Sequence, residues 1–101
     1  SDLTNANLQG AFIETTYIKN ATLIGTNFSD ATFTVSDFEG FNLTKTNFSN
    51  SILINGNFKN TILTQTDFNK SDLTNVDFSN SNLEDAIGGP FIGCMNHHLC
   101  E

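Results

Sequence analysis

The sequence has few basic side chains, and this scarcity limits the partners that we expect. Its 101 residues include four lysines and no arginine against eleven acidic residues, so the formal net charge is −7 at pH 7. Nucleic acids and anionic membrane surfaces are polyanions and repel a chain of this charge. We therefore expect neither a nucleic acid nor a membrane as a partner.

Several other features are missing from the sequence. No apolar run is long enough to cross a bilayer, and no basic segment followed by an apolar stretch marks a signal peptide. No nucleophile, base and orienting group lie at catalytic spacing, and there is no Gly-rich phosphate loop. We therefore expect no enzymatic activity and no cofactor. The first residue is Ser1 rather than Met, as it would be if a leader or larger flanks had been removed.

A repeat of five residues is present over most of the chain. A large apolar residue, the centre of each unit, recurs at every fifth position from Leu3 to Leu83 in 17 consecutive units. A mostly small residue precedes each centre by two positions, with Phe41 and Val76 as exceptions. This spacing fits neither an amphipathic helix nor an alternating strand.

The five-residue unit instead predicts a short extended segment followed by a turn. The small residue and the centre lie two positions apart, so both side chains point to the same side. The remaining positions are rich in Asn, Gly, Asp, Lys and Ser, which tolerate turn geometry. The pattern predicts a solenoid, in which each coil buries its small and large residues against the neighbouring coils.

The unit resembles that of the pentapeptide-repeat family, A-(D/N)-L-x-x. The clearest matches are Ala6–Leu8, Thr46–Phe48, Thr66–Phe68 and Ser71–Leu73. The resemblance covers residues 1–85 and implies an all-β fold, a right-handed quadrilateral parallel β-helix with four units in each coil. Seventeen units then make just over four coils. We expect residues 86–101 to form a short helical or irregular C-terminal cap.

Four units per coil give a period of 20 residues, and each side of the coil is called a face below. The first face carries the centres Leu3, Leu23, Leu43, Leu63 and Leu83, and the second carries Leu8, Phe28, Phe48 and Phe68. The third face carries Ile13, Phe33, Leu53 and Leu73, and the fourth carries Ile18, Phe38, Phe58 and Phe78. Phenylalanine therefore falls mainly on two opposite faces, where we expect the rings to stack.

Asn or Asp often stands directly before a centre, as at Asn47 and Asp67. Because this slot recurs around the whole coil, we interpret these side chains as partners of the local backbone rather than as metal ligands or catalytic acids. On the fourth face, Lys19, Glu39 and Lys59 follow each other in successive coils, and their alternating charges predict a solvated ladder.

The third face is less polar than the others in its outward positions. Phe12, Thr32, Thr34, Ile52 and Ile54 would lie there together, and an apolar patch of this kind is typical of an interaction site. Isolated surface apolar residues are the alternative interpretation. We name these five residues as the candidate binding surface for a protein partner.

The repeat stops after Asp85, and the segment that follows predicts a cap. Gly88, Gly89 and Pro90 end the solenoid, and Pro90 would be the first residue of a short helix that covers the last coil. No equivalent cap precedes Leu3, so the first coil is truncated, continued by further sequence, or paired with another copy. Self-association through this uncapped N-terminal coil is therefore one expectation.

The cap holds the one cluster with metal-ligand chemistry, Cys94, His97, His98 and Cys100. Three alternatives stay open: a Cys94–Cys100 disulfide, two free thiols, or a metal site whose spacing matches no usual zinc pattern. A disulfide would favour an exported or luminal oxidising compartment, and free thiols would favour the cytoplasm.

For function, the sequence favours a non-catalytic structural or protein-interaction module with an unknown protein partner. The family resemblance suggests one alternative, a DNA-mimicking modulator of a type II topoisomerase such as gyrase, because the chain is acidic. A second alternative is an ice-binding or other surface-binding β-helix that uses the threonines of the third face. The family is common in cyanobacteria, with related domains in the thylakoid lumen, so a luminal protein of this kind is one expectation.

Overall fold

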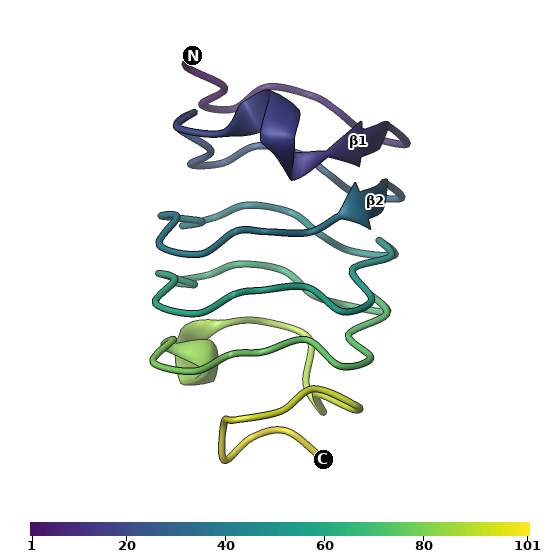
Figure 1. Ribbon diagram of the computed structural model, residues 1–101, viewed down its shortest axis with the longest axis vertical. Helices are drawn as coiled ribbons and strands as arrows, with labels where there is room; N and C mark the ends of the chain where they lie inside the picture. The colour runs from purple at the N-terminus through teal and green to yellow at the C-terminus, as the bar shows by residue number, and fades with distance from the viewer.

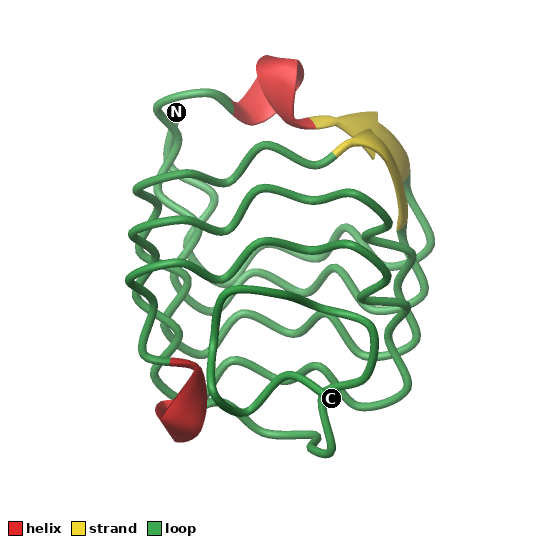
Figure 2. Cartoon of the chain, turned by 60° about the horizontal axis from the view of Figure 1, so that its bottom comes forward, coloured by secondary structure: helices red, strands yellow, loops and turns green.

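The computed structural model describes residues 1–101 as a stack of backbone coils around one axis, with the two termini at opposite ends (Figure 1). Its principal extents are 33 × 21 × 20 Å. Four short elements have regular secondary structure: the strands β1 (Phe12–Glu14) and β2 (Thr32–Val35), and the 3₁₀ helices η1 (Thr15–Ile18) and η2 (Leu83–Asp85). Figure 2 shows the two helices near opposite ends of the stack. No helix of the chain is long and apolar enough to span a membrane.

Residues 20 positions apart lie side by side in successive coils. β1 pairs with β2 in parallel, and isolated parallel bridges continue the pattern, for example from Asn7 to Asn27 and from Asn27 to Asn47. The only sheet is the two-stranded one formed by β1 and β2. The remaining contacts are single bridges because each unit supplies only a few extended residues before the chain turns.

The turns explain the residue preferences of the repeat. In the first unit, the N–H of Ala6 donates to the Leu3 carbonyl at 2.9 Å, and Asn5 between them has a φ of 60°. The position two residues after a centre, here called the corner position, has a positive φ in most units. A turn with a positive φ at its third residue is a type II turn, which favours Gly and Asn there. Gly10, Gly25 and many asparagines occupy the corner positions.

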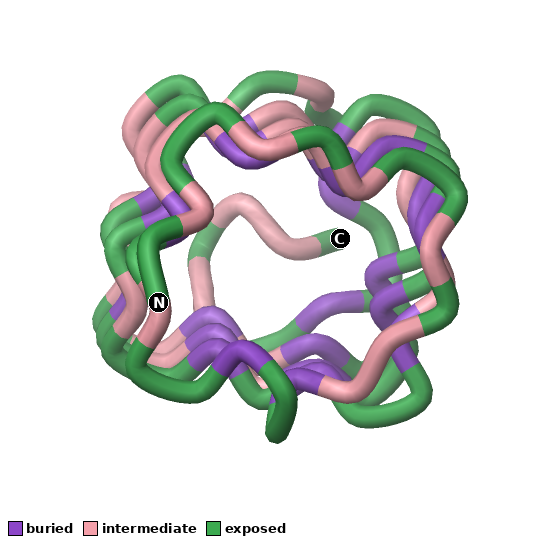
Figure 3. Tube along the Cα trace, turned by 90° about the horizontal axis from the view of Figure 1, so that it is seen from above, coloured by how far each residue is buried: buried purple, intermediate pink, exposed green.

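The centres form one continuous core inside the coils. From Leu23 to Leu83, every centre has at most a few per cent of its surface exposed. Rings stack along the second face, with centroids 5.5 Å apart for Phe28 and Phe48 and 5.6 Å apart for Phe48 and Phe68. The view along the axis shows buried segments recurring on the walls of the stack (Figure 3). The inward threonines are also satisfied, since Thr46 Oγ1 donates to the Leu23 carbonyl at 2.8 Å.

The cap over the last coil is irregular, and the helix predicted to begin at Pro90 is absent. Positive φ angles at Gly88, Gly93 and Asn96 interrupt any helical run. The backbone pairs instead with the coil above, since the Phe78 N–H donates to the Met95 carbonyl at 3.1 Å. A parallel bridge between Phe91 and Cys100 then folds the C-terminal residues back under the core. Long-range backbone pairing therefore replaces the helix.

Candidate functional site

The five residues of the candidate binding surface lie on neighbouring coils. Phe12 pairs with Thr32 in the two-stranded sheet, and Thr32 forms a parallel bridge with Ile52, so these three residues form one column. Phe12 is 83 % exposed, and Ile52 and Ile54 are each 42 % exposed. Thr34 and Ile54 line one side of a shallow hollow at the edge of this face.

One residue of this surface was missed in the sequence analysis. Val35 follows the third face at its corner position and is 39 % exposed. It extends the apolar surface toward the fourth face, because it lines the same hollow as Ile54. The signal that could have found it is a β-branched side chain at a corner position, because most corner positions hold Asn, Gly or another residue that is not β-branched.

The corners at Thr15 and Val35 depart from the regular turn. Neither residue has a positive φ, unlike most other corner residues. A β-branched residue is strongly disfavoured in the left-handed region, so the chain stays extended through Glu14 in β1 and through Val35 in β2. A register shift between Ile13 and Glu14 marks the same place in the ladder. The corner between the third and fourth faces is therefore wider in these two coils.

A cleft of about 350 Å³ follows this wide corner along the fourth face. Its walls come from the first and second coils. The residues that line it are Thr15, Thr16, Lys19, Asn20, Val35, Asp37, Glu39 and Phe41. On the other side of the corner, Ser36 lines the neighbouring hollow, and its Oγ is buried without a hydrogen-bond partner.

Comparison with known families identifies the chain. The family model for the pentapeptide repeat region matches residues 11–87. The chain belongs to the pentapeptide-repeat family. Membership implies a β-helix, and the mostly non-helical backbone with its parallel bridges agrees with that fold. No curated protein matches the sequence significantly.

The Asn and Asp side chains before the centres cap the local backbone in this pentapeptide-repeat protein, as predicted. The Asn47 Oδ1 accepts the N–H of Ser49 at 2.9 Å, and the Asp77 Oδ1 accepts the N–H of Ser79 at the same distance. The hydrogen bond from the Ser79 hydroxyl is the main cause that lowers the pKa of the Asp77 carboxyl below its usual value. These carboxylates are therefore occupied in turn formation.

The predicted solvated ladder of Lys19, Glu39 and Lys59 contains no direct ion pair. The one contact between a histidine and a carboxylate within ion-pair distance joins His97 and Glu84. The carboxylate of Glu39 instead accepts a hydrogen bond from the Asn57 side-chain amide at 3.1 Å. A short amide in the adjacent coil outcompetes the two long, solvated lysine side chains.

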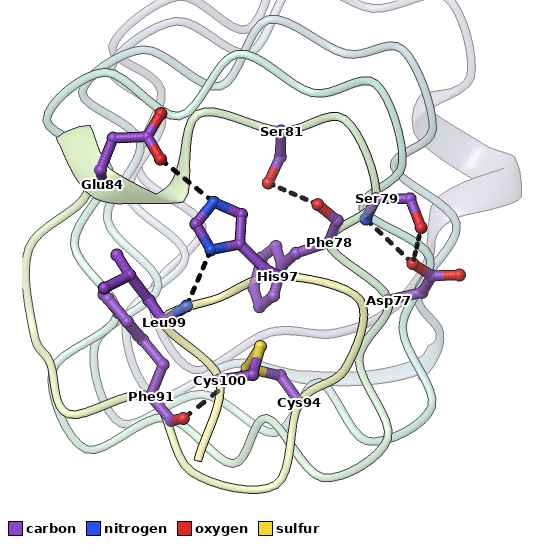
Figure 4. Close-up of a disulfide and its surroundings, with 10 residues drawn as sticks. All are labelled: Asp77, Phe78, Ser79, Ser81, Glu84, Phe91, Cys94, His97, Leu99 and Cys100. Atoms are coloured by element: carbon purple, nitrogen blue, oxygen red, sulfur yellow. Dashed lines mark hydrogen bonds and ion pairs between the residues drawn. A yellow bond between two sulfur atoms is a disulfide. The ribbon is translucent and has the colours of Figure 1, made fainter.

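The cap cluster contains the disulfide between Cys94 and Cys100 (Figure 4). Both sulfur atoms are therefore engaged, and Cys94, His97, His98 and Cys100 do not form a shared ligand set. Glu84 joins the two histidines instead, with ligand atoms within 4.8 Å of one another.

The hydrogen bonds of His97 define the tautomer of its ring. Its Nδ1 accepts the N–H of Leu99 at 3.1 Å, so the ring proton lies on Nε2 and points to the Glu84 carboxylate 3.1 Å away. A metal on Nε2 would require the proton on Nδ1, where it would oppose the Leu99 N–H. The contact between His97 and Glu84 therefore fastens the cap to η2.

Proposed function

We propose that this protein is a non-catalytic protein-interaction module that binds a protein partner through its third face. Members of the family are generally non-enzymatic structural or interaction modules. We further propose that residues 1–85 form a right-handed quadrilateral β-helix of just over four coils, which the parallel bridges 20 residues apart support. The cap then closes the C-terminal end of this scaffold.

The exposed column on the third face carries this proposal. Phe12 exposes 83 % of its surface, and Ile52 lies two coils below it on the same column. Exposed aromatic and β-branched side chains that gather on one face are typical of interaction sites. The coils hold the backbone on both sides, so binding here would require little ordering of the chain. A flat, pre-ordered surface therefore suits a folded protein partner.

The polar residues support a role without catalysis. The carboxylates before the centres accept backbone N–H groups, as Asp37 and Asp67 do from Glu39 and Asn69. Groups that act as turn caps all around the scaffold are not gathered at a reacting centre. The function therefore depends on the shape and chemistry of the surface.

The Ile52→Lys/Ile54→Lys variant tests the proposed surface. Two lysines at exposed positions should leave the core intact but place unpaired charge in an apolar contact. The matched control is Ile24→Lys/Ile62→Lys, which adds the same charge on the first face. We expect a pull-down from the source cells to lose its partner only with the third-face variant, with calorimetry on the purified partner to follow. Equal capture by both variants would contradict the proposed face.

Self-association is a second use that we propose for the scaffold. The first coil offers the half-buried centres Leu3, Leu8 and Ile13, whereas the centres below them are buried. Sedimentation equilibrium of the purified chain measures this directly. A single monomeric species at all concentrations would exclude pairing through the first coil.

We also propose that the protein works in an oxidising compartment. The Cys94–Cys100 disulfide supports this, because such bonds persist mainly outside the reducing cytosol. Intact mass of the protein isolated from its source under thiol-blocking conditions tests the proposal. A protein with two alkylated cysteines would contradict it.

A further inference from the structure

On the fourth face, the first and second coils lack a pair of backbone hydrogen bonds that joins the coils below them. Between the second and third coils, the N–H of Phe38 donates to the Asn57 carbonyl at 2.8 Å, and the N–H of Gly40 donates to the Lys59 carbonyl at 3.0 Å. The same pair of bonds recurs one coil further down. The fourth faces of the third and fourth coils therefore each present two carbonyls, from residues two positions apart, to the coil above.

The carbonyls of Asp37 and Glu39 occupy these positions in the second coil but accept no hydrogen bond from the protein. The residues expected above them are Ile18 and Asn20, 20 positions earlier in the chain. The N–H of Asn20 makes no hydrogen bond either. The ladder is thus open between the first and second coils on this face.

The 3₁₀ helix η1 accounts for the missing contacts. In η1 the buried side chains are Thr15 and Ile18, which are three positions apart. In a regular unit the two inward side chains are only two positions apart. Thr15 takes over one contact with its side chain, since its Oγ1 accepts the N–H of Asp37 at 3.0 Å. The first coil therefore stays attached at its corner while its backbone is drawn away from Asp37 and Glu39.

The cleft of about 350 Å³ lies where these contacts are missing. Asp37 and Glu39 line one wall, and Lys19 and Asn20 line the other. The volume is at the lower end of ordinary ligand sites. The cleft therefore offers free backbone acceptors on one wall and a free backbone donor on the other.

We propose that this cleft binds an extended basic peptide by β-strand addition to the second coil. The coils below indicate the chemistry, because the same two acceptors are filled there by N–H groups two residues apart on an extended backbone. Alternate outward side chains of the peptide would lie beside the carboxylates of Asp37 and Glu39, which outnumber the one ammonium group of Lys19 in the cleft. Ile18 already fills the core, so the inward residues of the peptide must be small.

The probe is the peptide Lys-Gly-Lys-Gly-Lys with acetyl and amide ends, titrated into isotope-labelled protein and followed by NMR. The glycine N–H groups would reach the two carbonyls, and the lysines would face outward. The matched control carries N-methylglycine in place of both glycines, which keeps the charge but removes both donors. We expect shifts at residues 15–20 and 35–41 with the first peptide and at least tenfold weaker binding of the control. Equal binding of the two peptides, or no shift at millimolar peptide, would overturn the proposal.

A protein variant gives a second test. Thr15→Asn/Val35→Asn places at both corners the residue that other corners use, so the regular turns can form and the first coil can pair with the second. We expect this variant to keep its fold by circular dichroism and to lose peptide binding at least tenfold. The control Gln65→Asn changes a corner remote from the cleft and should bind as the wild type does. Unchanged binding by a folded double variant would contradict the proposed site.

The cleft shares Val35 with the proposed third-face surface but not Ile52 or Ile54. Ile52→Lys/Ile54→Lys should leave the peptide affinity within about twofold, because neither residue lines the cleft. Loss of peptide binding in that variant would argue against strand addition at the fourth face. Failure of the third-face pull-down would leave the peptide experiment unaffected.

Discussion

The backbone N–H of Asp37 donates a hydrogen bond to the Thr15 Oγ1 at 3.0 Å, where the coils below use a backbone carbonyl as the acceptor. This contact joins the first two coils at the one corner where their turns are irregular. It also lets η1 move the first coil away from the second without leaving a buried N–H unpaired. A single hydroxyl thus supports the open cleft.

Replacing Thr15 tests that role. Thr15 is 3 % exposed, so Thr15→Val should leave the Asp37 N–H without its acceptor and lower the free energy of unfolding by about 1–3 kcal/mol. Thr15→Ser keeps the hydroxyl and should lose only about 1 kcal/mol with the methyl group. Urea unfolding measures both variants. A valine variant as stable as the serine variant would show that the hydrogen bond contributes nothing.

The corner positions predict a clear difference between two substitutions at Asn50. Asn50 is exposed, has a φ of 56° and makes no side-chain hydrogen bond, so its conformation is its main contribution. Asn50→Val should destabilise the protein by about 1–2 kcal/mol, because a β-branched residue is strained in the left-handed region. Asn50→Gly should be close to neutral. Thermal unfolding compares the two, and equal midpoints would contradict the assigned turn.

We predict that the Asp77 carboxyl makes the stability of the protein fall slightly at acid pH. Hydrogen bonds from the Ser79 hydroxyl and then its backbone N–H lower the pKa of Asp77 in the folded protein. Its stabilisation is therefore present above the unfolded pKa of about 3.9 and is lost as the pH falls through the lower folded value. Asp77→Asn keeps an acceptor for the backbone N–H, as Asn57 does for Lys59, but cannot titrate.

Thermal unfolding from neutral pH to about pH 3 compares the variant with the wild type. The wild type should lose slightly more stability than Asp77→Asn in the acid part of the range. Parallel curves would mean that the Ser79 contacts do not distinguish the two protonation states of Asp77.

Much of the fold could be predicted because the repeat encodes it locally. The period of five places the centres in the core, and short polar residues before them cap the turns, as at Asn47. Other features depend on competition between distant groups. Glu39 pairs with the Asn57 amide rather than with a lysine, and the segment after Pro90 pairs with carbonyl and N–H groups of the last coil instead of forming a helix.

The candidate cleft was missed although its cause is visible in the sequence. Thr15 and Val35 are β-branched residues at corner positions, where the left-handed conformation is needed. Two such residues stand one coil apart, so their irregular corners lie against each other. In a repeat protein, a residue that does not suit the conformation of its position therefore marks a candidate functional site.

Amide hydrogen exchange of Asn20, Gly40 and Asn60 tests the central claim most directly, because the three residues occupy the same corner position in successive coils. The N–H groups of Gly40 and Asn60 donate to carbonyls 3.0 and 2.9 Å away in the next coil, whereas that of Asn20 makes no hydrogen bond. We predict slow exchange at Gly40 and Asn60 and fast exchange at Asn20. Protection of Asn20 equal to that of Gly40 would show that the ladder is closed and would contradict the cleft.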